Sequence, residues 1–113
     1  MKDYWLVIDE ETMTVEICFP DNKQNAINAC LATIDFEQQE QMLRQLREIT
    51  ADTVPFTMSY EYFKMKVDPY TIDCEFHMFG EPVEFYLITR IFRDALGEYM
   101  KEMDKLCKER FGK

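Results

Sequence analysis

The fold is decided by the alternation in residues 70–78, which read YTIDCEFHM. Every second residue of this stretch is apolar or aromatic, namely Tyr70, Ile72, Cys74, Phe76 and Met78. The residues between them are polar, and a period of two is typical of a strand with one face on a core and the other in water. Residues 83–87, VEFYL, alternate in the same way. The two stretches predict a central antiparallel hairpin.

The connection of this hairpin contains Gly80, Glu81 and Pro82. Proline has no amide hydrogen to close a two-residue turn, and a three-residue turn would mix the polar and apolar faces. A four-residue loop over 80–83 keeps the faces separate. This loop predicts that Phe79 lies opposite Glu84, His77 opposite Tyr86, and Asp73 opposite Arg90.

A second hairpin opens the chain, where residues 4–8 read YWLVI and residues 13–19 alternate again. An even loop over 9–12 pairs Ile8 with Met13, Leu6 with Val15 and Tyr4 with Ile17, and places all six side chains on one face. Trp5 and Val7 then point outward beside Glu16 and Thr14. The alternative is that a helix covers Trp5, since tryptophan is mostly buried in proteins.

Helical spacing of apolar residues follows in two segments, about 24–34 and 36–50. Both begin with a capping-box pattern, Asp21 with Gln24 and Asp35 with Gln38,. Pro55 limits the second segment because the residue before a proline is pushed out of the helical region. A last helix is expected from Thr89 or Arg90, with a wide apolar stripe running to residue 107.

Residues 56–67 are ambiguous, because their alternation changes phase at residue 63. A strand with a bulge, or a helical turn, would explain the change. The element order therefore reads ββ-αα-βββ-α. We expect an α+β fold in which an antiparallel sheet of about five strands carries helices on one face, in a single domain over residues 1–113.

The N-terminal residues lack a basic region followed by a long apolar run, and no stretch approaches the ~20 apolar residues that span a bilayer. We expect a soluble cytoplasmic protein without membrane contact. The four cysteines, at positions 18, 30, 74 and 107, include no CxxC pair. Their spacing favours reduced thiols in a reducing compartment over a zinc site.

The charge is strongly one-sided. The chain has 22 acidic and 13 basic residues, a formal net charge of −9, which argues against direct nucleic-acid binding. Residues 1–85 hold 17 acids and 6 bases, and residues 67–86 hold five acids and no base. Such a surface attracts basic partners, although net charge also serves solubility alone.

One strand face concentrates candidate chemistry, because Asp73, Glu75 and His77 project from the same side of one strand. Asp73 and His77 are roughly 13 Å apart along such a strand, so one metal ion cannot use all three side chains. No phosphate-binding, zinc-protease, nucleophile-elbow or EF-hand motif occurs,. We therefore expect no cofactor, no metal and no enzymatic activity.

In length and charge the chain resembles the small inhibitors that phages and mobile elements direct against host nucleic-acid-handling defences, including anti-CRISPR and anti-restriction proteins. The resemblance assigns no residue. It implies a viral nucleic-acid mimic whose carboxylates replace phosphates in the basic groove of a nucleic-acid-binding enzyme. The expected contact residues are Glu16, Glu61, Asp73, Glu75, His77, Glu84, Tyr86 and Trp5.

Two alternatives stay open. In one, the protein is an obligate subunit that pairs with a second copy through its apolar last helix or an open sheet edge. In the other, it is a small-molecule binder or enzyme in which Asp73, Glu75 and His77 provide general acid–base groups.

Overall fold

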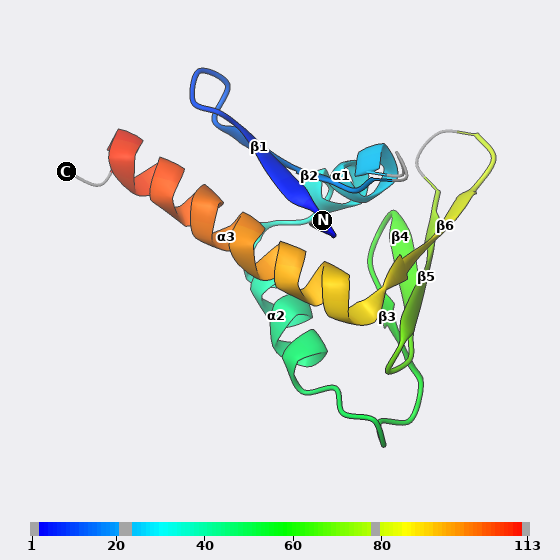
Figure 1. Cartoon of the computed structure of the whole chain (residues 1–113). Helices are drawn as coiled ribbons and strands as arrows, with labels where there is room; N and C mark the ends of the chain where they lie inside the picture. Colours follow the sequence, from blue (N-terminus) through cyan, green and yellow to red (C-terminus); the bar gives the residue numbers. More distant parts are fainter. Residues whose placement is uncertain (1–2, 21–23, 78–79, 112–113) are drawn as a thin grey trace.

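A computed structural model describes residues 3–20, 24–77 and 80–111. The α+β class is confirmed, with two antiparallel sheets and three helices in the order ββ-αα-ββββ-α (Figure 1). The strands are β1 Trp5–Asp9, β2 Thr14–Cys18, β3 Phe56–Ser59, β4 Phe63–Val67, β5 Thr71–Phe76 and β6 Val83–Ile88. The helices are α1 Gln24–Ala32, α2 Phe36–Arg47 and α3 Thr89–Phe111.

The larger sheet is a four-stranded meander in the order β3-β4-β5-β6. The predicted β5–β6 hairpin is confirmed, but its register differs from the prediction. Asp73 pairs with Tyr86 and not Arg90, and Glu84 pairs with Glu75; Phe79, its expected partner, lies outside the described residues. The partner of each β5 residue is four positions earlier than predicted, because the connection between the strands spans 77–82 and is centred two residues before the predicted loop. An even shift leaves the apolar side chains on the same face.

Residues 56–67 form a hairpin of two strands, β3 and β4, where the sequence predicted one interrupted strand. Met58 pairs with Met65 in this hairpin, so even-numbered residues of β3 lie opposite odd-numbered residues of β4. That pairing explains the phase change without a bulge. The Tyr60 amide donates to the Phe63 carbonyl at 2.8 Å, and the two rings stack with centroids 4.6 Å apart.

β1 and β2 form a separate two-stranded sheet. Leu6 pairs with Ile17 and Ile8 with Val15, two positions from the predicted register. The faces are again as expected, because the shift is even. The turn places Met13 in the left-handed region, with φ 59°.

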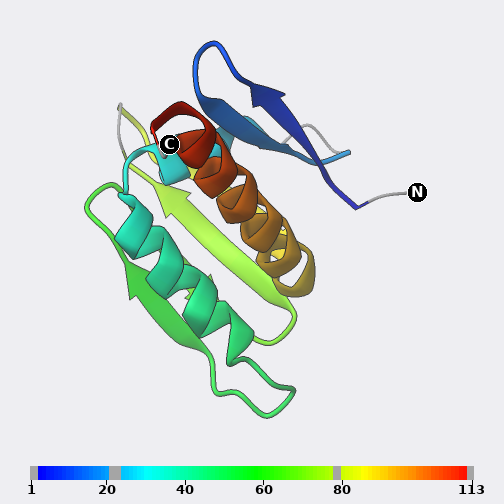
Figure 2. The same cartoon turned by 90° about the vertical axis from the view of Figure 1, so that its left-hand side faces the viewer.

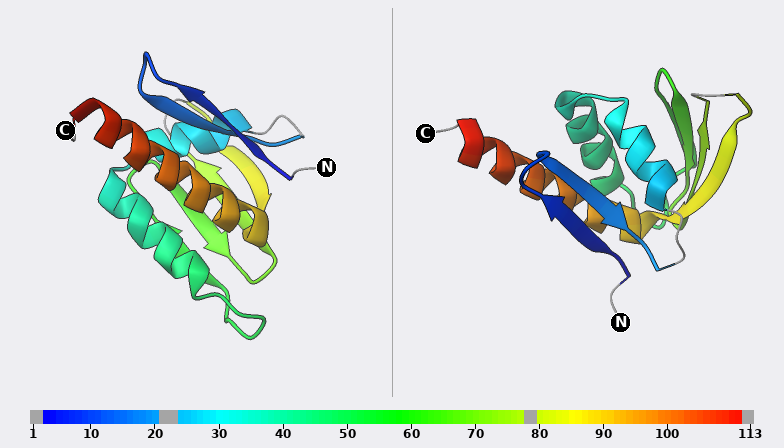
Figure 3. Two further views of the ribbon diagram at one scale, coloured as in Figure 1. Left: turned by 60° about the vertical axis from the view of Figure 1, so that its left-hand side comes forward. Right: turned by 90° about the horizontal axis from the view of Figure 1, so that it is seen from above.

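Helices α2 and α3 lie side by side across one face of the four-stranded sheet, and the β1–β2 hairpin flanks α3 on the side away from α2 (Figures 2 and 3). Asp35 and Gln38 make the predicted capping box at the start of α2. Asp21, the expected cap of α1, lies outside the described residues. Helix α3 starts at Thr89, directly after β6 and as predicted.

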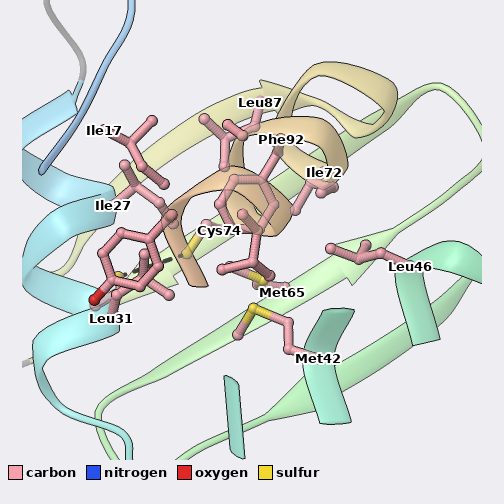
Figure 4. Packing of buried hydrophobic residues seen from close by; sticks show 14 of the residues in the cluster. Ile17, Ile27, Leu31, Met42, Leu46, Met65, Ile72, Cys74, Leu87 and Phe92 are labelled. Carbon is pink, nitrogen blue, oxygen red and sulfur yellow. Dashed lines mark hydrogen bonds between the residues drawn. The ribbon is translucent and has the colours of Figure 1, made fainter. Parts of the chain in front are cut away.

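The core joins both sheets and all three helices in one cluster (Figure 4). Its fully buried side chains include Ile17, Ile27, Met42, Leu46, Met65, Ile72 and Phe92. Burying each such side chain stabilises the fold by about 1.5–3 kcal/mol before entropy is counted. Within the core, the thiols of Cys30 on α1 and Cys74 on β5 lie 3.9 Å apart.

All four cysteines are free; Cys107 is exposed and the other three are buried. Among the described residues, no helix has the length and apolar character needed to cross a membrane.

Candidate functional site

The candidate site is the outer face of β5 and β6, formed by Asp73, Glu75, Glu84 and Tyr86, which we call the acidic face. These residues alternate with core residues of the same strands. The alternation aims them away from the helices and into solvent. The strand pairing then places them side by side.

Two carboxylates of the acidic face stand directly opposite each other. Glu75 on β5 pairs with Glu84 on β6. Like charges in this position destabilise an antiparallel pair, since their Cβ atoms are only about 5 Å apart. His77, just past the end of β5, contacts Glu75, with its Nε2 atom 2.6 Å from Oε1 of the carboxylate.

The next pair along the strands adds Asp73 and Tyr86. The Tyr86 hydroxyl donates to Oε1 of Glu84 at 3.3 Å. Asp73 and Glu84 raise the pKa of Tyr86 through their negative charge, and this hydrogen bond adds to the effect. Oδ1 of Asp73 is buried and has no hydrogen-bond partner in the part of the chain that the structure describes. The face thus holds one buried acceptor atom without a hydrogen-bond partner.

Sequence reasoning missed two cations on the same sheet surface, Lys64 and Lys66 of β4. Lys64 lies opposite Glu75, and Lys66 lies opposite Asp73. No ion pair within 4.0 Å joins them to these acids over residues 3–20, 24–77 and 80–111. The alternation of the two lysines with buried Phe63, Met65 and Val67 is the signal that would have found them. The anionic surface is therefore a stripe over β5 and β6, bordered by a row of cations.

Glu61 lies in the β3–β4 turn, at the sheet end where β5 finishes. The His77 amide donates to the Tyr62 carbonyl of this turn at 2.8 Å. Glu61 and His77 therefore share one end of the acidic face. The sequence predicted that His77 lies opposite Tyr86. This prediction is wrong, because the register places Tyr86 opposite Asp73, nearer the middle of β5.

Trp5 and Glu16 do not join this group, so the expectation that Glu16 lies near the acidic face is wrong. Both residues belong to the β1–β2 hairpin, which shares no paired strand with the larger sheet. Trp5 pairs with Cys18, and Glu16 pairs with Val7. Trp5 is 46 % exposed, so among the described residues no helix buries it completely.

Two hollows lie along the helices. One, of about 610 Å³, lies between α2 and α3 and is lined by Phe36, Arg44, Arg47 and Lys101 among others. Another, of about 470 Å³, is lined mainly by apolar residues of α1, α2 and α3. Across the described ranges, no group of three or more potential ligands could hold a metal ion.

Comparison with known proteins finds no family model, no curated protein and no solved structure that matches this chain.

Proposed function

We propose that the protein is a non-enzymatic binding protein whose acidic face occupies a basic, phosphate-binding surface of a nucleic-acid-handling protein. An inhibitor of this kind fits the anti-defence role of small phage and mobile-element proteins, acting in the cytoplasm. The observation that supports it best is the Glu75–Glu84 pair, in which two carboxylates face each other across the strands.

The energetics of this pair favour a binding role. Opposed carboxylates repel each other in the free protein, and an incoming arginine relieves that repulsion. A carboxylate accepts two parallel hydrogen bonds from a guanidinium group, as a phosphate does.

Lys64 and Lys66 restrict how a basic partner can be placed on the sheet. A partner must place its cations over β5 and β6 and keep them away from β4, where the two lysines would repel them. Such complementarity affects partner choice and association rate more than total affinity.

The test uses a triple variant of the acidic face, Asp73→Asn, Glu75→Gln and Glu84→Gln. Its control removes the same charge from exposed positions of α2 and its C-cap by Glu37→Gln, Glu40→Gln and Glu48→Gln. The immobilised wild-type protein should retain a nucleic-acid-binding protein from a host lysate and release it to added DNA or RNA. The triple variant should lose this capture, and the control should keep it.

Salt provides a second readout, because screening weakens charge pairs that contact solvent. Retention should fall steeply between low and high salt. Equal capture by both variants, or capture that neither salt nor nucleic acid reverses, would overturn the proposal.

The oligomer alternative has one observation in its favour, the outer edge of β1, which pairs with no other strand in the described part of the chain. It predicts a sedimentation coefficient that rises with protein concentration.

The acid–base alternative relies on the short His77–Glu75 contact. It predicts that His77→Gln abolishes binding of a small molecule at the sheet surface, and saturable binding unaffected by that change would exclude this role.

A further inference from the structure

The outer edge of β1 presents a free row of backbone hydrogen-bonding groups. The Asn28 side chain of α1 holds both backbone groups of Ile17, accepting from its amide and donating to its carbonyl, each at 2.9 Å. The backbone groups of Ile17 therefore point toward α1 and away from β1. When two opposite residues of an antiparallel pair exchange no hydrogen bonds, the amide and carbonyl groups of both residues point away from the partner strand.

This geometry fixes the direction of the β1 backbone. Leu6 pairs with Ile17, and Ile8 pairs with Val15 two residues further along. Because the two kinds of pair alternate along the strands, neither of these two pairs exchanges hydrogen bonds. The amide and carbonyl groups of Leu6 and Ile8 therefore face solvent at the free edge of the hairpin. No hydrogen bond to them occurs among residues 3–20, 24–77 and 80–111.

The edge lacks the usual protection against strand addition. Edge strands commonly carry lysine, proline or a bulge, whereas residues 5–8 are Trp-Leu-Val-Ile. Trp5, Val7 and Ile8 are exposed, at 46 %, 48 % and 43 %. Such a strand is a template for pairing with another chain.

The charge around the edge favours a basic partner strand. Residues 3–19 carry five acids, Asp3, Asp9, Glu10, Glu11 and Glu16, and no lysine or arginine. Of these five, Asp3 has a cation nearby, because Arg90 of α3 lies 4.0 Å from its carboxylate. Asp9 and Glu16 lie on the same face of the hairpin as Trp5, whereas Leu6 and Ile8 project from the other face. A strand that alternates basic and apolar residues would match both faces, with its cations beside Asp9 and the Trp5 ring.

We propose that β1 accepts an extended basic segment of another protein as a third strand of the hairpin sheet. A second copy of this chain fits less well. Antiparallel self-pairing centred on Val7 would place Asp3 beside Glu11, and parallel self-pairing would align Asp9 with Asp9. Both arrangements bring like charges together. This binding surface is distinct from the acidic face. The proposal for β1 can therefore be tested independently of the proposed function.

The experiment adds a capped peptide of alternating valine and lysine to the labelled protein and follows amide hydrogen exchange residue by residue. In the free protein, the amides of Leu6 and Ile8 should exchange quickly, and those of Val7 and Asp9 slowly. Saturating peptide should protect Leu6 and Ile8. A peptide of the same composition with its lysines in one block, and one N-methylated at alternate backbone amides, should not.

Two protein variants test whether the peptide binds through the β1 backbone or through the acidic face. Ile8→Pro removes an amide that faces solvent and contributes nothing to pairing with β2, and it should weaken peptide binding about tenfold. The acidic-face triple variant should bind the peptide as the wild type does. If Ile8→Pro unfolds the hairpin, the N-methylated peptide still decides the question from the partner's side.

Unprotected Leu6 and Ile8 amides at saturating peptide would overturn the proposal. Equal binding of the N-methylated peptide would also overturn it, since charge attraction alone would then explain the affinity. Protection that develops without peptide as protein concentration rises would replace the basic segment with a second copy of this chain.

Discussion

The hydroxyl group of Thr89, the first residue of α3, donates a 2.9 Å hydrogen bond to the backbone carbonyl of Asp68 in the β4–β5 turn. The Thr89 amide donates to the Tyr70 carbonyl of the same turn at 3.1 Å. Thr89 is one of the two buried polar residues that the described part of the chain contains. The start of the long helix is therefore tied to a turn of the four-stranded sheet.

Replacing Thr89 by valine should lower the free energy of unfolding by about 1–2 kcal/mol. Valine keeps the shape but leaves the Asp68 carbonyl without its donor. Chemical denaturation measures the loss, and Thr57→Val on the exposed face of β3 is the matched control. Equal changes in the two variants would show that the buried hydrogen bond adds no stability.

Acid should weaken the same turn through Asp68. The amides of Thr71 and Tyr70 donate to its carboxylate and lower its pKa below the ordinary value of 3.8. A lowered folded-state pKa adds stability above the ordinary value, and this contribution is lost as the pH falls through the folded-state pKa. The stability gap between wild type and Asp68→Asn should therefore shrink between about pH 5 and pH 2.

Denaturation at several pH values measures this gap, and Asp52→Asn, an exposed substitution, provides the comparison. A gap that stays constant across that range would contradict the role assigned to the Asp68 charge.

Asn28→Ala should lower the free energy of unfolding by about 1–3 kcal/mol, because it removes both hydrogen bonds to Ile17 and leaves a donor and an acceptor unpaired,. Thermal or chemical unfolding gives the loss. Gln45→Ala, exposed on α2, should be nearly neutral. Faster exchange of β2 amides in the Asn28 variant would place the effect in the hairpin, and an unchanged stability would refute the bracing role.

Gly97→Ala should stabilise the protein by about 0.5–1 kcal/mol, because glycine is a poor residue inside a helix. An added Cβ would lie 3.2 Å from a guanidinium nitrogen of Arg47, the end of an exposed side chain that can move aside. Gly80→Ala should have the opposite sign, since Gly80 has φ 70°,. Melting temperatures compare the two, and a destabilising Gly97→Ala would show that Arg47 cannot yield.

Thiol reactivity should separate the cysteines into two groups. Burial raises the pKa of Cys18. The Cys30 thiol and burial together hold the pKa of Cys74 above its usual range. An aromatic disulfide reagent should modify Cys107 quickly in the native protein and all four thiols in denaturant,. Cys107→Ser should abolish the fast reaction, whereas rapid modification of a second thiol would show that the core opens readily.

The sequence predicted those parts of the fold that depend on local patterns. Alternation identified β5 and its polar face, and the Asp35–Gln38 pattern identified the start of α2. Both hairpin registers were wrong, because the alternation of the strands does not encode the position of the turn between them. The faces were still right, since both shifts were even.

The candidate site was predicted only in part, because its neighbours come from other strands. Asp73, Glu75 and Glu84 were expected together, and the pairing of β5 with β6 brings them together. The cations opposite Asp73 and Glu75 come from β4. Residues 63–67 were not recognised as a strand of their own, so Lys64 and Lys66 could not be placed. Trp5 and Glu16 were grouped with the site because the sequence did not reveal that the fold has two sheets.

The division into two sheets has a mechanical consequence. Under the two proposals the binding surfaces lie on separate sheets, so the protein would act as a tether between two basic partners, or as a clamp on one partner that carries both matching regions. In the second case, docking at one surface raises the effective concentration of the other contact, and total affinity exceeds that of either contact alone. Loss of one surface would then shorten the lifetime of the complex without abolishing it.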